Sequence, residues 1–461
     1  MKGAIFFLSA TSGLVVSIHS FFGATSLFSS TPQSISLRAR SWGIGLGSIV
    51  MVGVPIMIIS AKTVQITLPL LLVAALAGAI VRERLAQLAA PRTPDAIALM
   101  LLIGFAMLSG LWSAVPWASA SIAAMAAVIA VGSLALMALL RQERTEDIRH
   151  IGEGLWIGVL VGALYTIVEV ASGQALKIWA YNLLSLGPDV LEPDRYFTWE
   201  NGVLVAVHFD DLTRNVVPIP LLMWPALMTV AALRERKWRR NVGAALVCLS
   251  LLAVFGATSE TAKLAIVAGG LTFVLARYAP PAARYAVPIA WVAACLAAIP
   301  LVLLMRHLEW QDASWLQLSA QMRIVSWSEI AHRVAAAPLF GVGADMTYFI
   351  EPTVSEAPRA FPEWGGSALA HPHNVYLQAW YELGLAGVLL MTAFGLALLR
   401  TISRLDVVVQ PYALALFSTA AVQIASSYNI WQIWFMCLFG FSSVMFAVGQ
   451  KNIESQSAIL A

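Results

Sequence analysis

Charged side chains are scarce in this sequence of 461 residues. Asp, Glu, Lys and Arg make up only 11% of the chain, whereas 59% of the residues are hydrophobic. A soluble domain usually carries about 25% charged residues, so the shortage argues against a soluble protein. The basic residues also form no long basic face, which argues against nucleic acid as a partner.

Motifs for metals, nucleotides and disulfides are also missing. Cys248, Cys295 and Cys437 all lie in apolar blocks and form neither a CxxC pair nor a set of disulfides. The sequence has no Walker A motif, HExxH motif, GxSxG elbow or DxD-type acidic pair, and no Cys/His cluster with metal-ligand spacing. We therefore expect no nucleotide motor, no metal and no cofactor.

The apolar residues come in blocks of roughly 17–22 residues, separated by short polar stretches. A block of this length crosses about 30 Å of hydrocarbon as an α-helix, and a helix pairs its own backbone polar groups in lipid. The sequence therefore predicts an all-α, polytopic membrane protein with about 12 transmembrane helices. The predicted spans are 43–60, 63–81, 96–113, 118–140, 152–172, 214–233, 241–257, 261–278, 285–305, 376–399, 409–427 and 430–448.

The two ends of the chain lie outside this set of spans. Residues 3–23 are apolar but rich in Ser and Gly, and they lack a clear small-residue cleavage site. They fit a thirteenth span, an uncleaved signal-like stretch or a helix lying on the membrane. We therefore divide the chain into an N-terminal segment (1–42), a polytopic domain (43–449) and a cytoplasmic tail (450–461).

Lys and Arg are concentrated in every second loop, which predicts that these loops are cytoplasmic. Two long segments, 174–213 and 306–375, then lie on the outer, periplasmic side. Loops of this length are usually functional or disordered, and aromatic residues in both make disorder the weaker interpretation. Five of the seven histidines lie in them, so we expect any chemistry on the outer face: His208, His307, His332, His371 and His373.

The second outer loop has a readable order of elements. Residues 315–335 have apolar positions spaced three and four apart, which predicts an amphipathic helix on the outer surface. The turn PLFGVG follows at 338–343. HPHN at 371–374 then begins the next span, with Pro372 suited to a helix start.

The segment HPHNVYLQAWYELGLAG, residues 371–387, holds the sharpest group of candidate residues. His373 and Asn374 lie where the helix enters the membrane, and a histidine there could take a proton from a sugar hydroxyl. Gly384 and Gly387 lie roughly 16–21 Å deeper at about 1.5 Å per residue, where we expect them to let another helix approach closely. On spacing alone, His371 and His373 also fit ordinary interfacial polar residues.

Three basic residues at the outer membrane boundary are candidates for phosphate binding, against the positive-inside trend. Arg214 begins the sixth predicted span, Arg323 lies in the predicted surface helix, and Lys263 follows the turn TSET. Guanidinium groups bind phosphate oxygens through paired hydrogen bonds. Snorkelling fits all three residues as well, and so do local salt bridges, with Asp210 or Asp211 for Arg214 and with Glu329 for Arg323.

Taken together, these residues carry a family resemblance. His373, Asn374, Gly384 and Gly387 match the signature His, then Asn, Ser or Gln, nine residues, then Gly-x-x-Gly. The segment therefore resembles that of bacterial O-antigen ligases and related polysaccharide polymerases.

Two further stretches agree with the resemblance. LSGLWSAVPWASA (108–120) is similar to the family's Trp-Ser turn, and RIVSW with PLFGVG (323–343) is similar to its Arg-containing outer helix and glycine turn. The resemblance covers most of residues 43–449 and is specific from 323 to 387.

The resemblance implies a GT-C-like fold and a metal-independent, inverting glycosyltransferase in the bacterial inner membrane, with its active site facing the periplasm. The implied donor is a polyprenyl-diphosphate-linked glycan, and the implied acceptor is a glycan or the lipid A-core. His373 would be catalytic, supported by Asn374, His371, Gly384 and Gly387. Arg323, Arg214 and Lys263 would bind the diphosphate, although TSETAK departs from the Ser-Arg or Ser-Lys pair of relatives. Flippase and chain-length-regulator proteins are candidate partners.

The signature does not separate a ligase, which attaches finished polysaccharide, from a polymerase, which joins repeat units. Transfer to protein hydroxyls is a third version. A multi-span transporter or flippase is the alternative from another class, but it should carry ionisable groups near the bilayer midplane. A non-catalytic assembly subunit, which would tolerate loss of His373, is the remaining option.

Overall fold

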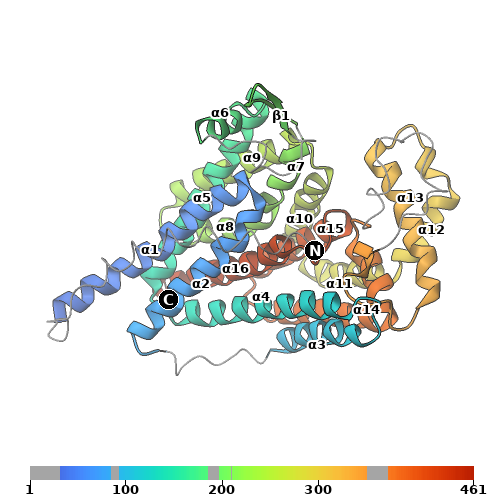
Figure 1. Ribbon diagram of the computed structural model, residues 1–461. Helices are drawn as coiled ribbons and strands as arrows, with labels where there is room; N and C mark the ends of the chain where they lie inside the picture. The colour runs from blue at the N-terminus through green and yellow to red at the C-terminus, as the bar shows by residue number, and fades with distance from the viewer. Residues whose placement is uncertain (1–31, 85–92, 185–196, 209, 350–371, 461) are drawn as a thin grey trace.

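The computed structural model describes residues 32–84, 93–184, 197–208, 210–349 and 372–460 (Figure 1). His371 and the segment 3–23 lie outside the described residues, so the structure does not bear on the predictions made for them. The described chain is mainly helical, as expected. Its one sheet in this part of the chain is a two-stranded hairpin in the first outer loop.

Nine helices of the described chain are long and apolar enough to cross a membrane. A tenth span is formed if α11 (Pro280–Leu296) and α12 (Ala298–His307), which meet at a bend of 68°, are counted together. These helices confirm a polytopic membrane protein. The nine are α1 (Pro32–Ile59), α2 (Val64–Val81) with the 3-10 turn before it (Ala61–Thr63), α3 (Pro94–Leu108) with the 3-10 turn after it (Ser109–Leu111), α4 (Pro116–Gln142), α5 (Thr145–Ser172), α9 (Arg236–Gly256), α10 (Glu260–Tyr278), α14 (Val375–Ile402) and α16 (Ile433–Leu460).

Three predicted spans differ from the structure. The predicted sixth and eleventh spans are the shorter helices α8 (Pro218–Ala231, 14 residues) and α15 (Gln410–Ser426, 17 residues). The predicted span 285–305 is broken at Ala297 between α11 and α12. Pro300 explains this break, because a proline ring clashes with the carbonyl four residues earlier and cannot donate to it.

Small residues bring α1 and α5 into close contact. A Cβ at Gly154 of α5 would overlap the carbonyl oxygen of Gly47 of α1, and one at Gly158 would meet Val54 at 2.8 Å. Helices in lipid associate through such close backbone approach. The α1 helix begins at Pro32 and α16 continues to Leu460, so both run across the boundaries that the sequence suggested at 42/43 and 449/450.

The first outer loop is folded on the end of α5. It contains α6 (Ala175–Leu183), the hairpin of β1 (Phe197–Glu200) and β2 (Val203–Val207), and the short helix α7 (Asp210–Asn215). Asn201 and Gly202 join the strands with φ of 50° and 79°, the backbone that a tight two-residue hairpin turn requires. Buried Glu169 of α5 accepts backbone N–H groups of Leu176 and Lys177, so it fixes this loop on the end of α5.

The second outer loop stands out at one end of the bundle, where α12 and α13 lie side by side (Figure 1). The predicted amphipathic helix is observed as α13 (Leu318–Arg333), followed by a short 3-10 turn, Val334–Ala336. Gly341 and Gly343 have φ of 68° and 114°, so the predicted glycine turn is confirmed. The α14 helix begins at Val375, three residues later than a start at Pro372.

Candidate functional site

His373 lies immediately before α14, in a conformation fixed by its neighbours. Asn374 caps the helix, because its side-chain oxygen accepts the backbone N–H of Leu377 at 3.1 Å. His373 itself has φ of 49°, and its Nδ1 lies 2.6 Å from the carbonyl oxygen of Ser427. Because a carbonyl can only accept, Nδ1 carries the proton and Nε2 of the neutral ring is the basic nitrogen.

Tyr428 is the point on which the predicted site residues converge. Its ring centroid lies 6.4 Å from that of His373, and the Arg214 guanidinium carbon lies 5.8 Å from the same centroid. Arg323 interacts electrostatically with the Tyr428 hydroxyl. Helices α7, α13 and α14 thus bring a histidine and two arginines to the segment 427–432, which joins α15 to α16.

Arg323 lies on the face of α13 that meets the start of α14. Trp327, one turn later on the same face, donates its indole N–H to the carbonyl of Pro372, next to His373. Burial lowers the pKa of Arg323, and the Tyr428 hydroxyl opposes this by raising it. The expected alternative, a salt bridge to Glu329, is not made, because Glu329 pairs with Arg333 at 2.6 Å.

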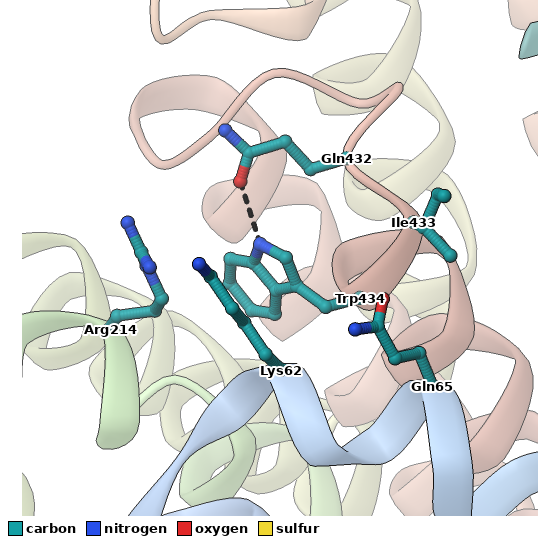
Figure 2. Close-up of a pocket in the computed structure, with 6 residues that line it drawn as sticks. All are labelled: Lys62, Gln65, Arg214, Gln432, Ile433 and Trp434. Atoms are coloured by element: carbon teal, nitrogen blue, oxygen red, sulfur yellow. Dashed lines mark hydrogen bonds between the residues drawn. The ribbon is translucent and has the colours of Figure 1, made fainter. Parts of the chain in front are cut away.

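Arg214 lines a pocket of about 400 Å³ together with five other residues, shown in Figure 2: Lys62, Gln65, Gln432, Ile433 and Trp434. The side chains of Arg214 and Lys62 extend from different elements toward the same space (Figure 2). The Arg214 Nε is buried and has no hydrogen-bond partner among the described residues. The side chains of Asp210 and Asp211, the suggested salt-bridge partners of Arg214, lie outside the described part of the structure.

Arg214 differs from its prediction in one respect, because it belongs to α7 and not to the following transmembrane helix. Lys263 lies in the first turn of α10 and pairs with Glu260 at 2.8 Å. The adjacent Thr261 donates to the carbonyl of Ser426 at 2.9 Å. The turn that carries Lys263 therefore contacts the site segment, while the Lys263 charge is paired and does not line the pocket.

Gly384, the first of the two signature glycines, does not have the predicted role. Gly384 has φ of 62° and ψ of −165°, a break inside α14, and its neighbour is the turn 338–343 rather than another helix. Leu385 and Ala386 donate backbone N–H groups to the carbonyls of Pro338 and Leu339, at 2.9 and 3.0 Å. The expectation of a helix–helix contact is wrong because a backbone with this φ and ψ is available only to glycine.

The nearest atoms that a Cβ at Gly387 would meet belong to Leu383, one turn earlier in α14. The turn 338–343 also contacts the stretch 108–120, since Trp112 donates its indole N–H to the carbonyl of Gly341 at 3.2 Å. Both stretches that resemble the family signature outside 371–387 thus meet at the break in α14.

A buried polar network holds the segment 427–432 against α14. Glu382, with 1% of its surface exposed, accepts the indole N–H of Trp431 at 2.6 Å and the amide of Gln378 at 3.1 Å. Gln378 also donates to Asn429 at 2.7 Å and accepts the backbone N–H of Ile430 at 3.3 Å. These hydrogen bonds position the segment that carries Tyr428 and Ser427, whose carbonyl is bonded to His373.

Sequence reasoning missed Tyr428, Lys62 and the Gln378–Glu382 pair. Two signals were present for them. Lys62 is a basic residue in a short predicted outer turn, between the first two spans. Gln378 and Glu382 are polar residues four apart in a span that is otherwise apolar, which usually marks a buried polar contact.

We expect Gly384→Ala to destabilise the fold strongly. Alanine resists this backbone, and its Cβ would lie 2.5 Å from the Leu339 carbonyl carbon, so the expected cost exceeds about 2 kcal/mol. Thermal unfolding of the purified protein in detergent should show a lower midpoint. Gly104→Ala in α3 is the matched control, because no atom lies within 4 Å of the added Cβ. An unchanged midpoint in Gly384→Ala would contradict the observed break.

Comparison with known proteins finds similarity in the part of the chain that carries three of the candidate site residues. Residues 244–392 match the family model described as O-antigen ligase, a range that includes Lys263, Arg323 and His373. The chain is 27% identical over 230 residues to "Putative polysaccharide ligase" of Rickettsia conorii, covering 49% of this chain and 54% of that protein. It is 26% identical over 230 residues to the protein of the same name from Rickettsia felis, covering 49% and 55%.

The match thus spans about half the length of these curated relatives. Arg214, Lys62 and Tyr428 lie outside the residues that the family model matches. The family match, the named relatives and the many apolar helices together support the assignment of this multi-pass membrane protein to an O-antigen ligase family.

Proposed function

We propose that this protein is a membrane glycosyltransferase that moves an oligo- or polysaccharide from a polyprenyl-diphosphate donor to a sugar hydroxyl. The proposal places it in a bacterial inner membrane with its site facing the periplasm. One observation carries it: His373 and Arg214 both lie beside the Tyr428 ring, and the helix that carries Arg323 is bonded through Trp327 to Pro372, next to His373. A base beside two guanidinium groups suits a reaction in which a hydroxyl attacks and a diphosphate leaves.

In this mechanism the Nε2 of His373 accepts the proton of the acceptor hydroxyl as its oxygen attacks the anomeric carbon of the donor. The bond between that carbon and the diphosphate oxygen breaks, and the polyprenyl diphosphate leaves with the bonding electrons. Attack opposite the leaving group inverts the anomeric centre. The hydrogen bond from Nδ1 of His373 to Ser427 holds the ring in the required tautomer.

The arginines stabilise the charge that develops on the leaving diphosphate. Arg323 is partly buried between α13 and the start of α14, where its interaction with an anion is stronger than in water. Among the described residues, no carboxylate oxygen lies within 4.0 Å of its guanidinium nitrogens. Because cationic side chains provide this stabilisation, the mechanism assigns no step to a metal ion.

Glycan analysis of a deletion strain tests the proposal. Loss of surface attachment together with accumulated long lipid-linked chains is the result expected of a ligase. Accumulated single repeat units are expected of a polymerase. Surface and lipid-linked glycans identical to those of the parent strain would contradict both versions, and complementation with the intact gene is the control.

A further inference from the structure

Glu382 is a buried carboxylate for which the transfer mechanism has no step. It belongs to the membrane-spanning helix α14, and 1% of its surface is exposed. Ionisable side chains are costly to bury inside a membrane, and where they occur they usually serve function. Its hydrogen-bond partners in the described part of the chain are all donors, so the side chain acts there as a carboxylate that only accepts.

The two carboxylate oxygens of Glu382 bind different parts of the chain. Oε1 accepts the backbone N–H of Thr347 at 3.2 Å and also the hydroxyl hydrogen of the same residue, which follows the glycine turn in the second outer loop. Oε2 accepts the indole N–H of Trp431 at 2.6 Å, in the segment 427–432. Glu382 thus joins the second outer loop to the segment that contacts His373.

The backbone around Glu382 is held as firmly as its side chain. In an unbroken helix the carbonyls of Tyr381 and Glu382 would accept the N–H groups four residues later, but the break at Gly384 directs those N–H groups to the glycine turn. The two carbonyls instead accept the backbone N–H groups of Val342 and Gly343, at 3.1 and 2.8 Å. This exchange fixes the position from which the Glu382 side chain extends.

The segment 427–432 follows one face of α14. Three side-chain contacts occur in the same order along both: His373 with Ser427, Gln378 with Ile430, and Glu382 with Trp431. At about 1.5 Å per residue, the first and last of these contacts lie about 13 Å apart along α14. Trp431 therefore anchors the far end of the segment, and loss of that anchor would allow the near end to move away from the His373 ring.

We propose that Glu382 is a positioning residue for His373: by joining Trp431 to the second outer loop, it keeps the Ser427 carbonyl on Nδ1 of the His373 ring. That carbonyl fixes the tautomer in which Nε2 is basic, so Glu382 acts on proton transfer only through His373. The consequence for glycan transfer rests on the proposed function, whereas the position and tautomer of the ring do not.

The tautomer of His373 can be measured without any transfer reaction. Nitrogen NMR of the full-length protein in detergent, with isotope-labelled histidine and at a pH where the ring is neutral, distinguishes protonated Nδ1 from protonated Nε2. His373→Asn identifies the signal. The unaltered protein should show protonated Nδ1.

Glu382→Gln should change this tautomer. The amide N–H₂ group faces a donor in either orientation, and turning the amide oxygen toward Thr347 and Gln378 keeps more contacts and gives up Trp431. We therefore expect a mixture of the two tautomers at His373. A ring that keeps Nδ1 fully protonated in Glu382→Gln would overturn the inference.

Trp431→Phe breaks the same contact from the other side, and it decides the question if Glu382→Gln does not fold. Because both changes remove one hydrogen bond, their effects on the tautomer ratio should not add in the double variant. Glu143→Gln is the matched control, since Glu143 is also buried and pairs with Arg82, but lies at the opposite end of α4 from Trp112 and the glycine turn. An equal tautomer change in Glu143→Gln would assign the effect to general loosening and overturn the inference.

Transfer kinetics connect the tautomer to the reaction. In Glu382→Gln, kcat should fall about tenfold or more, because slight misplacement of a reacting group costs up to about 100-fold, while Glu143→Gln should keep the unaltered kcat. A changed tautomer with an unaltered kcat would support the positioning role and contradict the use of His373 as the base. If the unaltered protein shows no transfer, the proposed function fails, and the tautomer measurement still decides the positioning role.

Discussion

Replacing His373 with alanine is expected to abolish glycan transfer while the protein remains folded in the membrane. The His373 ring centroid lies 6.4 Å from that of Tyr428, and the ring is fixed there by the Ser427 carbonyl. Loss of a positioned general base lowers rates by about 10²–10⁴-fold. The measurement is transfer from a purified polyprenyl-diphosphate-linked glycan, with protein amount determined in the membrane fraction.

Two further variants separate chemistry from folding. His373→Asn keeps a residue that tolerates positive φ and that can donate to the Ser427 carbonyl, but it lacks the basic nitrogen, so it should fold and remain inactive. His332→Ala makes the same change as His373→Ala at an exposed position of α13, and it should transfer normally. Normal transfer by either His373 variant would eliminate the catalytic assignment and favour an assembly subunit.

Replacing Arg323 with lysine is expected to impair transfer although the positive charge is kept. Lysine lacks the planar fork that grips two phosphate oxygens at once, and a lost charged hydrogen bond costs about 1.5–3 kcal/mol, or roughly 10- to 100-fold in kcat/KM. Arg323→Ala should lose more, because it also leaves the diphosphate without a cation. Steady-state kinetics with a synthetic lipid-linked donor measures both effects.

Arg333 of the same helix provides the control for Arg323. It forms an ion pair with Glu329 at 2.6 Å on a partly exposed face, and pairs of this kind contribute little. Arg333→Lys should therefore transfer at nearly the unaltered rate. Full activity in Arg323→Lys would argue against a two-pronged contact with the diphosphate.

The sequence predicted the helical content, the amphipathic helix α13 and the position of His373 at the start of a transmembrane helix. These features depend on local pattern: apolar blocks, a three-and-four spacing, and a polar cap before an apolar run. The twelve predicted spans were less accurate. Hydropathy alone does not distinguish a span from shorter buried helices such as α8 and α15, or a straight span from one broken near Pro300.

From the sequence, the candidate site residues could be predicted one at a time but not as a group. Arg214, Arg323 and His373 could be named from chain position and motif, but their meeting point at Tyr428 could not, since Tyr428 lies in a short connection with no motif. Gly384 was recognised and then misinterpreted, because its spacing from Gly387 fits helix packing as well as it fits a break. The positive φ that decides between them is a property of the folded backbone.

By itself the sequence determined that the chain crosses a membrane many times, and it predicted that the candidate site residues belong to one set of loops, because hydropathy and charge placement act locally along the chain. Tertiary structure decided which of those residues meet. Lys62 and Arg214 are 152 positions apart and line one pocket, where Asn215 is bonded to Ala61. The helix that carries Arg323 is joined to the residue before His373 by the hydrogen bond from Trp327 to Pro372. Contacts between distant segments depend on the packing of whole helices, and no local pattern encodes that packing.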